Sequence, residues 1–186
     1  MNVYDFDNTI YRGDSSGHFC IYCFSRYPKT LLTLPKTAIT FLRYKAGKCP
    51  LTQFKQQLFS FMRFLPNAES VIDKFWAKHE KNIKDWYLAQ KSDDIIISAS
   101  PEFLLTPVCG RLGVRLIASP VDIRTGTFSG LNCRDEEKVR RLDKQYPGTV
   151  IDNFYSDSYA DTPLAKLAKN AYMVKGDKIE PWQWRE

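Results

Sequence analysis

The sequence predicts an α/β protein built on a doubly wound, mainly parallel sheet with an inserted all-helical block. Beyond residue 93, short β-branched runs alternate with helical segments, which is typical of a parallel sheet covered by helices on both faces. Before residue 91, apolar residues instead recur at the three- and four-residue spacing of helices. We therefore expect a core made of residues 1–13 and 91–186 and a helical cap made of residues 14–90.

The composition fits a globular protein of this kind. The chain has 186 residues, of which 44% are apolar, and this length suits one domain with a modest insertion. The net charge is +6, but Lys and Arg form no dense block, so we interpret it as a solvated basic surface and expect no nucleic-acid partner. Five cysteines are an odd number, and no secretory signal opens the chain, so we expect a reducing, cytoplasmic setting. No sequence pattern indicates an oligomeric state.

The elements can be placed in order along the chain. A short apolar run forms a first strand that leads into two carboxylates, and turn residues 11–17 follow. Prolines divide the stretch from about 18 to 90 into several helices, the first of them capped by Ser15 or Ser16. The core continues with strands at 94–98, 114–118, 150–155 and 171–174, helices at 101–112, 135–146 and 163–169, and a hairpin at 121–130. Residues 181–184 are expected to pack against the core.

A pair of cysteines in the first helix invites a test for metal binding. Cys20 and Cys23 are three residues apart, and His18 and Cys49 are conceivable further ligands. Zinc modules carry a second cysteine pair, which this chain lacks. We therefore expect the two thiols to be buried in the helical block.

Two carboxylates directly after the first strand carry the strongest chemical signal. Asp5 and Asp7 are two residues apart, so a regular strand would point both to one side. Carboxylates at one place repel unless a cation or a shared proton intervenes. This predicts a magnesium site in which one carboxylate is also a nucleophile. Ser98 and Asp157 also fall at predicted carboxyl ends of strands, where a parallel sheet gathers its ligand-binding loops.

The segment Asp5-Phe6-Asp7-Asn8-Thr9 resembles the D-x-D-x-T signature of the haloacid dehalogenase superfamily, most of whose members are phosphatases. Three later stretches match the other motifs of that family in the right order. They are Ser98 after Ile95-Ile96-Ile97, Lys138 ahead of Val139, and Asp157 followed by Asp161. The helical insertion after the first motif resembles the cap of the phosphoserine-phosphatase-like branch. The resemblance covers essentially the whole chain and implies a Rossmann-like core.

The resemblance implies a role for each matching residue. Asp5 would be the nucleophile that forms an aspartyl-phosphate, and Asp7 would protonate the leaving group and then activate water. Asp5, the backbone carbonyl of Asp7 and Asp157 would bind Mg²⁺. Ser98 and Lys138 would bind the phosphate, and Asp161 would hold Lys138 or metal-bound waters. Further phosphate-binding positions implied by the motifs are Phe6, Thr9 and Ala99.

At three positions the sequence departs from the family motifs or allows another role. Ser100 is more simply the N-cap before Pro101, although it could exchange roles with Ser98. Many relatives have Gly where this chain has Asn8, a residue that tolerates left-handed backbone better than most. The usual Gly before the metal-binding aspartate is Ser156 here.

These features predict a magnesium-dependent phosphatase that hydrolyses a small phosphorylated substrate selected by the cap. One alternative is a lipid-phosphate phosphatase at an anionic membrane surface. Residues 27–45 are basic and apolar but too interrupted to span a bilayer, and with residues 132–133 and 155–158 they resemble bacterial phosphatidylglycerophosphate phosphatases. The chain would then be peripheral to the membrane. A further alternative is a phosphotransferase or a phospho-acceptor signalling module, since receiver domains also phosphorylate an aspartate.

Overall fold

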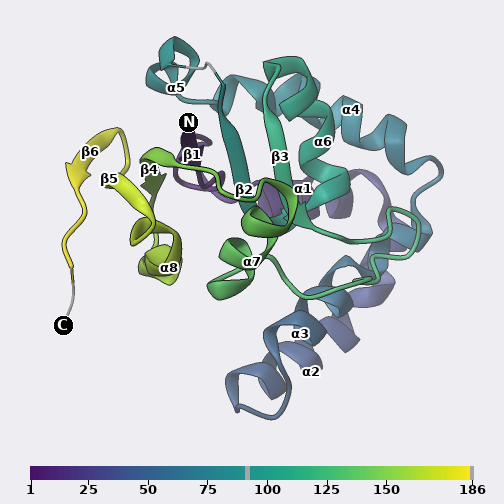
Figure 1. Ribbon diagram of the computed structural model, residues 1–186. Helices are drawn as coiled ribbons and strands as arrows, with labels where there is room; N and C mark the ends of the chain where they lie inside the picture. Colours follow the sequence, from purple (N-terminus) through teal and green to yellow (C-terminus); the bar gives the residue numbers. More distant parts are fainter. Residues whose placement is uncertain (91–92, 185–186) are drawn as a thin grey trace.

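A computed structural model describes residues 1–90 and 93–184, and in these residues six strands form one sheet (Figure 1). The strand order is β3-β2-β1-β4-β5-β6, and all neighbouring pairs are parallel except β5 and β6. This arrangement confirms the predicted α/β class with its mainly parallel sheet. The strands are β1 (Asn2–Tyr4), β2 (Ile95–Pro101), β3 (Arg115–Ser119), β4 (Ile151–Ser156), β5 (Ala168–Lys175) and β6 (Lys178–Pro181).

The stretch between β1 and β2 is helical, as predicted. Its α-helices are α1 (Ser15–Arg26), α2 (Leu34–Lys45), α3 (Leu51–Phe59), α4 (Ala68–His79) and α5 (Asp85–Gln90). Short 3-10 helices link them at Pro28–Thr33, Ser60–Phe64 and Glu80–Asn82. After β2 come α6 (Glu102–Leu112), α7 (Glu136–Gln145), a 3-10 turn at Tyr159–Asp161 and α8 (Thr162–Ala165).

The sheet is apolar on both faces because alternate strand residues point to opposite sides. Val3, Ile95 and Ile97 belong to the cluster that packs with α7 and α8 through Leu142 and Leu164. The neighbouring residues of these strands face the opposite side of the sheet. Tyr4, Ile96 and Tyr155 join a larger cluster that includes α6 and the helical block.

The helical block has two parts with different surroundings. Phe19 of α1 and Trp76 of α4 share one apolar cluster with the sheet, and the Trp76 indole donates to the Leu104 carbonyl of α6 at 2.6 Å. By contrast, α2 and α3 project away from the sheet as a pair (Figure 1). The segment that leads from β1 into the helical block lies beside the segment near the end of the block, because Lys84 N donates to Ile10 O at 2.8 Å.

Several local predictions need correction. The N-cap of α1 is Asp14, whose carboxylate accepts from Gly17 N at 2.7 Å, and not Ser15 or Ser16. The helix expected at 163–169 ends at Ala165, because Ala168 already pairs with Ile151 of β4. The strand β6 was not expected. The turn at 121–130 forms with a single Val121–Phe128 bridge.

Other local predictions are confirmed. Of residues 181–184, which were expected to pack against the core, Trp182 is buried against Phe154, whereas Trp184 is 57% exposed. Cys20 and Cys23 are buried in the helical block. Among residues 1–90 and 93–184, no helix combines the length and apolarity needed to cross a membrane.

Candidate active site

The predicted site residues meet at the carboxyl edge of the sheet, around its central strand. β1 lies between β2 and β4, and Asp5 directly follows it, held by a hydrogen bond from Asp5 N to Tyr155 O at 2.9 Å. Ser98 lies in β2 where its regular pairing with β3 is interrupted, and Asp157 directly follows β4. The chain therefore delivers polar groups from three neighbouring strands to the switch point of the sheet, where doubly wound proteins bind ligands.

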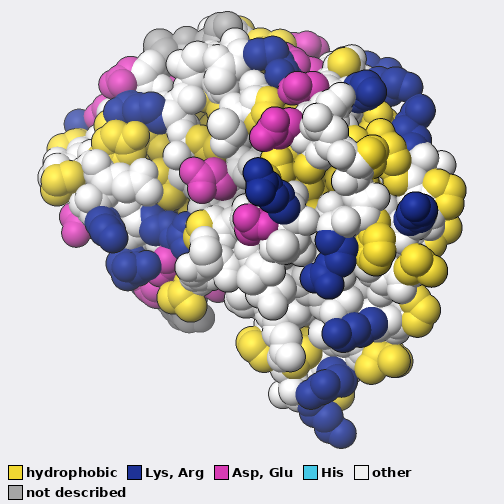
Figure 2. Space-filling model, turned by 90° about the vertical axis from the view of Figure 1, so that its right-hand side faces the viewer, with side chains coloured by type: hydrophobic (Ala, Val, Ile, Leu, Met, Phe, Trp, Pro, Cys, Tyr) yellow, Lys and Arg dark blue, Asp and Glu magenta, His cyan; other side chains and the backbone are white. Residues whose placement is uncertain are grey.

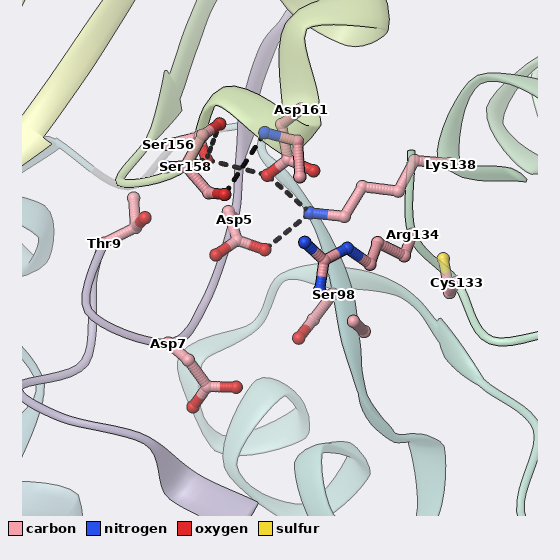
Figure 3. A network of polar contacts seen from close by, with 12 residues as sticks. Asp5, Asp7, Thr9, Ser98, Cys133, Arg134, Lys138, Ser156, Ser158 and Asp161 are labelled. Carbon is pink, nitrogen blue, oxygen red and sulfur yellow. Dashed lines mark hydrogen bonds and ion pairs between the residues drawn. The ribbon is translucent and has the colours of Figure 1, made fainter. Parts of the chain in front are cut away.

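A buried ion-pair network joins Asp5 to the helix α7 (Figure 3). Lys138 Nζ lies 2.6 Å from Asp5 Oδ1 and 2.8 Å from Asp161 Oδ2. Ser156 Oγ donates to the same Asp161 oxygen at 2.7 Å. The Lys138 side chain is only 2% exposed, so its charge depends on these two carboxylates. Asp161 thus holds Lys138 against Asp5.

Burial and charge act in opposite directions on this network. Burial raises the pKa of Asp5, although the nearby Lys138 ammonium lowers it. Burial alone would lower the pKa of Lys138, but Asp5 and Asp161 raise it above its ordinary value. Lys138 therefore stays positively charged at any physiological pH.

Asp7 contacts a separate set of groups. Its Oδ1 accepts from Ser15 N at 2.6 Å, and its Oδ2 accepts from the Ser100 hydroxyl at 2.5 Å. The carboxylates of Asp5 and Asp7 thus have different partners, because β1 ends at Tyr4 and regular strand alternation stops there. Burial and the charge of Asp14 raise the pKa of Asp7. Ser100 was expected to cap the helix at residue 101, but it binds Asp7 instead, and Pro101 is the N-cap of α6.

The loop after β1 and the loop after β4 support each other. Thr9 is fully buried, and its hydroxyl accepts from Asp157 N at 2.9 Å. Asn8 adopts a left-handed φ of 57°, as expected for a residue that replaces Gly. Burial and Asp161 raise the pKa of Asp157, while the Asn8 side chain lowers it. Thr9 therefore orients the Asp157 backbone.

Two predicted phosphate-binding residues can act only through their backbones. The Phe6 ring is fully buried against Tyr11 and Trp76. Ala99 carries no polar side chain, and its carbonyl accepts from Lys55 Nζ and Ser119 Oγ, each at 3.0 Å. Ser98 is buried, and its Oγ accepts from Ser100 N at 3.1 Å.

The donor set fits Mg²⁺. Four carboxylates, those of Asp5, Asp7, Asp157 and Asp161, lie in the loops that meet here, and Lys138 pairs directly with only two of them, Asp5 and Asp161. Oxygen is the ligand type that Mg²⁺ prefers. In the described part of the chain, no three His, Cys, Asp or Glu side chains are placed to bind one ion. Asp5 and Asp157 would therefore need the Asp7 carbonyl and water as further ligands, which suits an ion that keeps several waters.

Further cations near the site were not assigned from sequence, among them Lys55 and Arg134. Lys55 lies in α3 and reaches the backbone of β2 at Ala99. Arg134 precedes α7 and points toward the same site in Figure 3, with its side chain 46% exposed. Arg134 was considered only as a rival to Lys138. No local sequence signal marks Lys55, because its partner lies 44 residues away.

Comparisons with known proteins agree with this architecture. Residues 3–166 match the family described as haloacid dehalogenase-like hydrolase. The chain is 26% identical to histidinol-phosphatase from Neisseria meningitidis serogroup C (strain 8013), across 95% of this chain and 90% of that protein. Among solved structures, a protein of unknown function from Bordetella pertussis Tohama I has a TM-score of 0.71 at 19% identity, covering 92% of this chain and 87% of that one. A phosphoserine phosphohydrolase-like protein from Francisella tularensis subsp. tularensis SCHU S4 has a TM-score of 0.56 at 15% identity, covering 92% and 86%.

Proposed function

The chain belongs to the haloacid dehalogenase-like hydrolases, and we propose that it is a magnesium-dependent phosphatase acting on small phosphomonoesters through an aspartyl-phosphate on Asp5. One observation carries this proposal. Asp5 lies at the carboxyl end of the central strand and is held by a buried lysine that a second carboxylate anchors. A nucleophile and a fixed positive charge beside it are what phosphoryl transfer through an enzyme carboxylate requires. The phosphatase names of similar proteins support it further.

The proposed reaction has two halves. An Asp5 oxygen attacks phosphorus, the bond to the leaving oxygen breaks, and Asp7 donates a proton to that oxygen. Water then attacks the aspartyl-phosphate, Asp7 takes its proton, and Asp5 and inorganic phosphate are released. Bound Mg²⁺ would neutralise charge on the phosphoryl oxygens, held by Asp5, Asp157 and the Asp7 carbonyl.

The other site residues position these groups. Lys138 would offset charge between Asp5 and the phosphate, and Asp161 would keep it there. Ser98, with the backbone at Phe6 and Ala99, would bind phosphate oxygens, while Thr9 would hold the Asp157 loop. Residues 14–90 would act as the cap that selects the substrate, with α2 and α3 as its projecting part.

The first test is phosphate release from amino-acid, sugar, nucleotide and lipid phosphomonoesters, with and without Mg²⁺. We expect turnover that requires Mg²⁺, and we expect Asp157→Ala to lower activity about 100-fold or more while shifting the Mg²⁺ titration to higher concentrations. An Asp157→Ala enzyme with an unchanged titration would contradict the ligand assignment. No turnover of any ester by folded, magnesium-supplemented protein would favour the phosphotransferase or phospho-acceptor alternative, for which stoichiometric labelling of Asp5 is the readout.

A second candidate function is hydrolysis of a lipid phosphate at an anionic membrane surface. No acidic residue occurs between Asp14 and Glu69, a stretch that contains eight Lys and Arg residues. The lower, projecting end of the molecule accordingly shows hydrophobic and basic side chains without acidic ones (Figure 2). Leu32, in the 3-10 helix before α2, and Ile39 and Leu42, in α2, are 60–70% exposed. Exposed apolar side chains beside basic ones are the composition of surfaces that bind anionic lipid.

A groove in the same region strengthens this candidate. It has a volume of about 290 Å³, and its lining includes Lys36, Arg43 and Arg63 with no acidic residue. Such a groove is suited to an anionic headgroup.

Vesicle sedimentation tests the membrane candidate. We expect binding to phosphatidylglycerol vesicles but not to phosphatidylcholine vesicles, and we expect salt to weaken it. The double variant Leu32→Gln/Leu42→Gln should lower binding at least about tenfold, because it removes the apolar contact. Leu167→Gln, at a 54% exposed leucine outside residues 14–90, is the matched control. Equal binding by both variants, or no binding of the wild type, would contradict the candidate.

A further inference from the structure

Lys55 brings the projecting helices into contact with the edge of the site. It lies in α3, and its ammonium donates to Ala99 O at 3.0 Å and to Asn132 Oδ1 at 3.1 Å. Ala99 adjoins the predicted phosphate-binding Ser98, and Asn132 lies in the loop before α7. Lys55 therefore connects the helical block to β2 and to the loop before α7.

The two acceptors of Lys55 are fixed by a third residue. Ser119, at the end of β3, donates its hydroxyl toward both Ala99 O and Asn132 Oδ1, at 3.0 and 3.1 Å. The Ser119 hydroxyl in turn accepts from Cys133 N at 2.9 Å. The buried Ser119 thus links the two part-buried acceptors that set the position of the ammonium.

The ammonium has no anionic partner of its own. In residues 1–90 and 93–184, no carboxylate lies within 4 Å of Lys55, and both of its acceptors are neutral. A lysine ammonium has three donors, so one remains after these two bonds. Lys55 is half-buried, and burial lowers its pKa.

The neighbours of Ala99 locate Lys55 within the site. Ala99 lies between Ser98 and Ser100 in β2, and the Ser100 hydroxyl donates to Asp7 Oδ2 at 2.5 Å, whereas Asp5 is paired with Lys138. Lys55 is therefore linked to the Asp7 side of the site through this segment, and among the carboxylates Asp7 also raises its pKa most. In the proposed reaction, Asp7 serves the leaving oxygen, and Asp5 and Lys138 serve the transferring phosphoryl group.

We propose that Lys55 is a specificity-determining residue that binds a second anionic group on the leaving group of the substrate. This inference rests on the proposed phosphatase function and adds the class of ester to it. The favoured substrates are phosphomonoesters whose alcohol carries a carboxylate or a phosphodiester near the ester oxygen. Neutral alcohols lack the group that completes the third bond of Lys55. A charged hydrogen bond to a half-buried ammonium is among the stronger polar contacts in proteins.

Matched pairs of soluble esters test this inference. 3-Phosphoglycerate and glycerol 3-phosphate differ in a carboxylate, and glycerophosphoglycerol phosphate carries a phosphodiester instead. We expect the wild type to prefer one or both anionic esters by about tenfold to 100-fold in kcat/KM, and Lys55→Gln to remove this preference mainly through KM. Activity on glycerol 3-phosphate should fall less than activity on the anionic esters, because its alcohol has no group for Lys55 to bind. Lys55→Arg should retain most of the preference because it keeps the charge.

Controls separate this outcome from failure of the proposed function. Lys74→Gln, at an exposed lysine of α4, should leave all three activities unchanged. Thermal unfolding of each variant checks the fold. If Lys55→Gln lowers all three activities equally, or if the wild type shows no preference for anionic alcohols, the inference is wrong while the phosphatase proposal stands. If the wild type hydrolyses none of the esters with Mg²⁺ present, the proposed function itself is wrong.

Discussion

Asp5→Asn is expected to reduce phosphate release by about 1000-fold or more while leaving the protein folded. The amide has the size of the carboxylate but cannot form an aspartyl-phosphate. Lys138 keeps its 2.8 Å contact with Asp161 in this variant, so the buried ammonium retains a charged partner. The amide oxygen can still accept from Lys138, so we expect the free energy of unfolding to change by less than about 2 kcal/mol. Phosphate release and thermal unfolding measure the two effects.

Asp143→Asn is the matched control for this substitution. Asp143 is an exposed residue of α7, so its variant should keep wild-type activity and stability. Residual Asp5→Asn turnover within tenfold of the wild type would refute the assignment of Asp5 as the nucleophile. Loss of activity together with unfolding would instead assign Asp5 a structural role.

The sheet could be predicted from sequence because its strands are locally distinctive. Ile95-Ile96-Ile97 is apolar on both faces, as a central parallel strand requires, and the structure buries all three residues. The predicted fold class and the predicted family are both confirmed. The edge strand β6 was missed because it is short and alternates charged residues with apolar ones. Its turn at Gly176-Asp177, with a Gly φ of 60°, was the signal that could have revealed it.

The site was predictable only where topology alone determines position. Parallel strands bring their carboxyl ends to one edge, so the strand ends in the sequence suffice to predict that Asp5, Ser98 and Asp157 lie near one another. The hydrogen-bond partners of each side chain depend on how the chain turns after each strand, which the spacing of residues in the sequence does not encode. The chain turns after Tyr4, which separates the contacts of Asp7 from those of Asp5, and Ser100 joins Asp7 across 93 residues of sequence.

The position of the helical block decides the remaining contacts. Its helices could be predicted from the three- and four-residue spacing of their apolar residues. The face that each helix packs against the core could not be predicted in this way. Lys55 looked like one of several solvated lysines, since only the packing of α3 over β2 brings it to Ala99. The division into a core and a cap at residues 14–90 stays a prediction, because α1 and α4 share one apolar cluster with the sheet.

Lys138→Met is expected to lose both activity and stability. The substitution keeps the apolar stem but removes the ammonium that pairs with both Asp5 and Asp161, so two buried carboxylates lose their shared partner. Removing one partner of a buried ion pair costs about 3–5 kcal/mol of unfolding free energy. Activity should fall about 100-fold or more, because the charge that offsets the phosphate is gone. Denaturant unfolding and phosphate release measure the two losses.

A second substitution separates the two roles of Lys138. In Lys138→Met/Asp161→Asn, one of the two unpaired carboxylates becomes neutral while its oxygen still accepts from Ser156. We expect this double variant to regain at least about half of the lost stability but none of the lost activity. Lys144→Met, at an exposed lysine of the same helix, controls for the loss of a surface charge. If neutralising Asp161 restores no stability, the cost of Lys138→Met lies in packing and not in charge. Recovery of both stability and activity would mean that the lysine only compensates Asp161, and that the phosphate is neutralised elsewhere in the site.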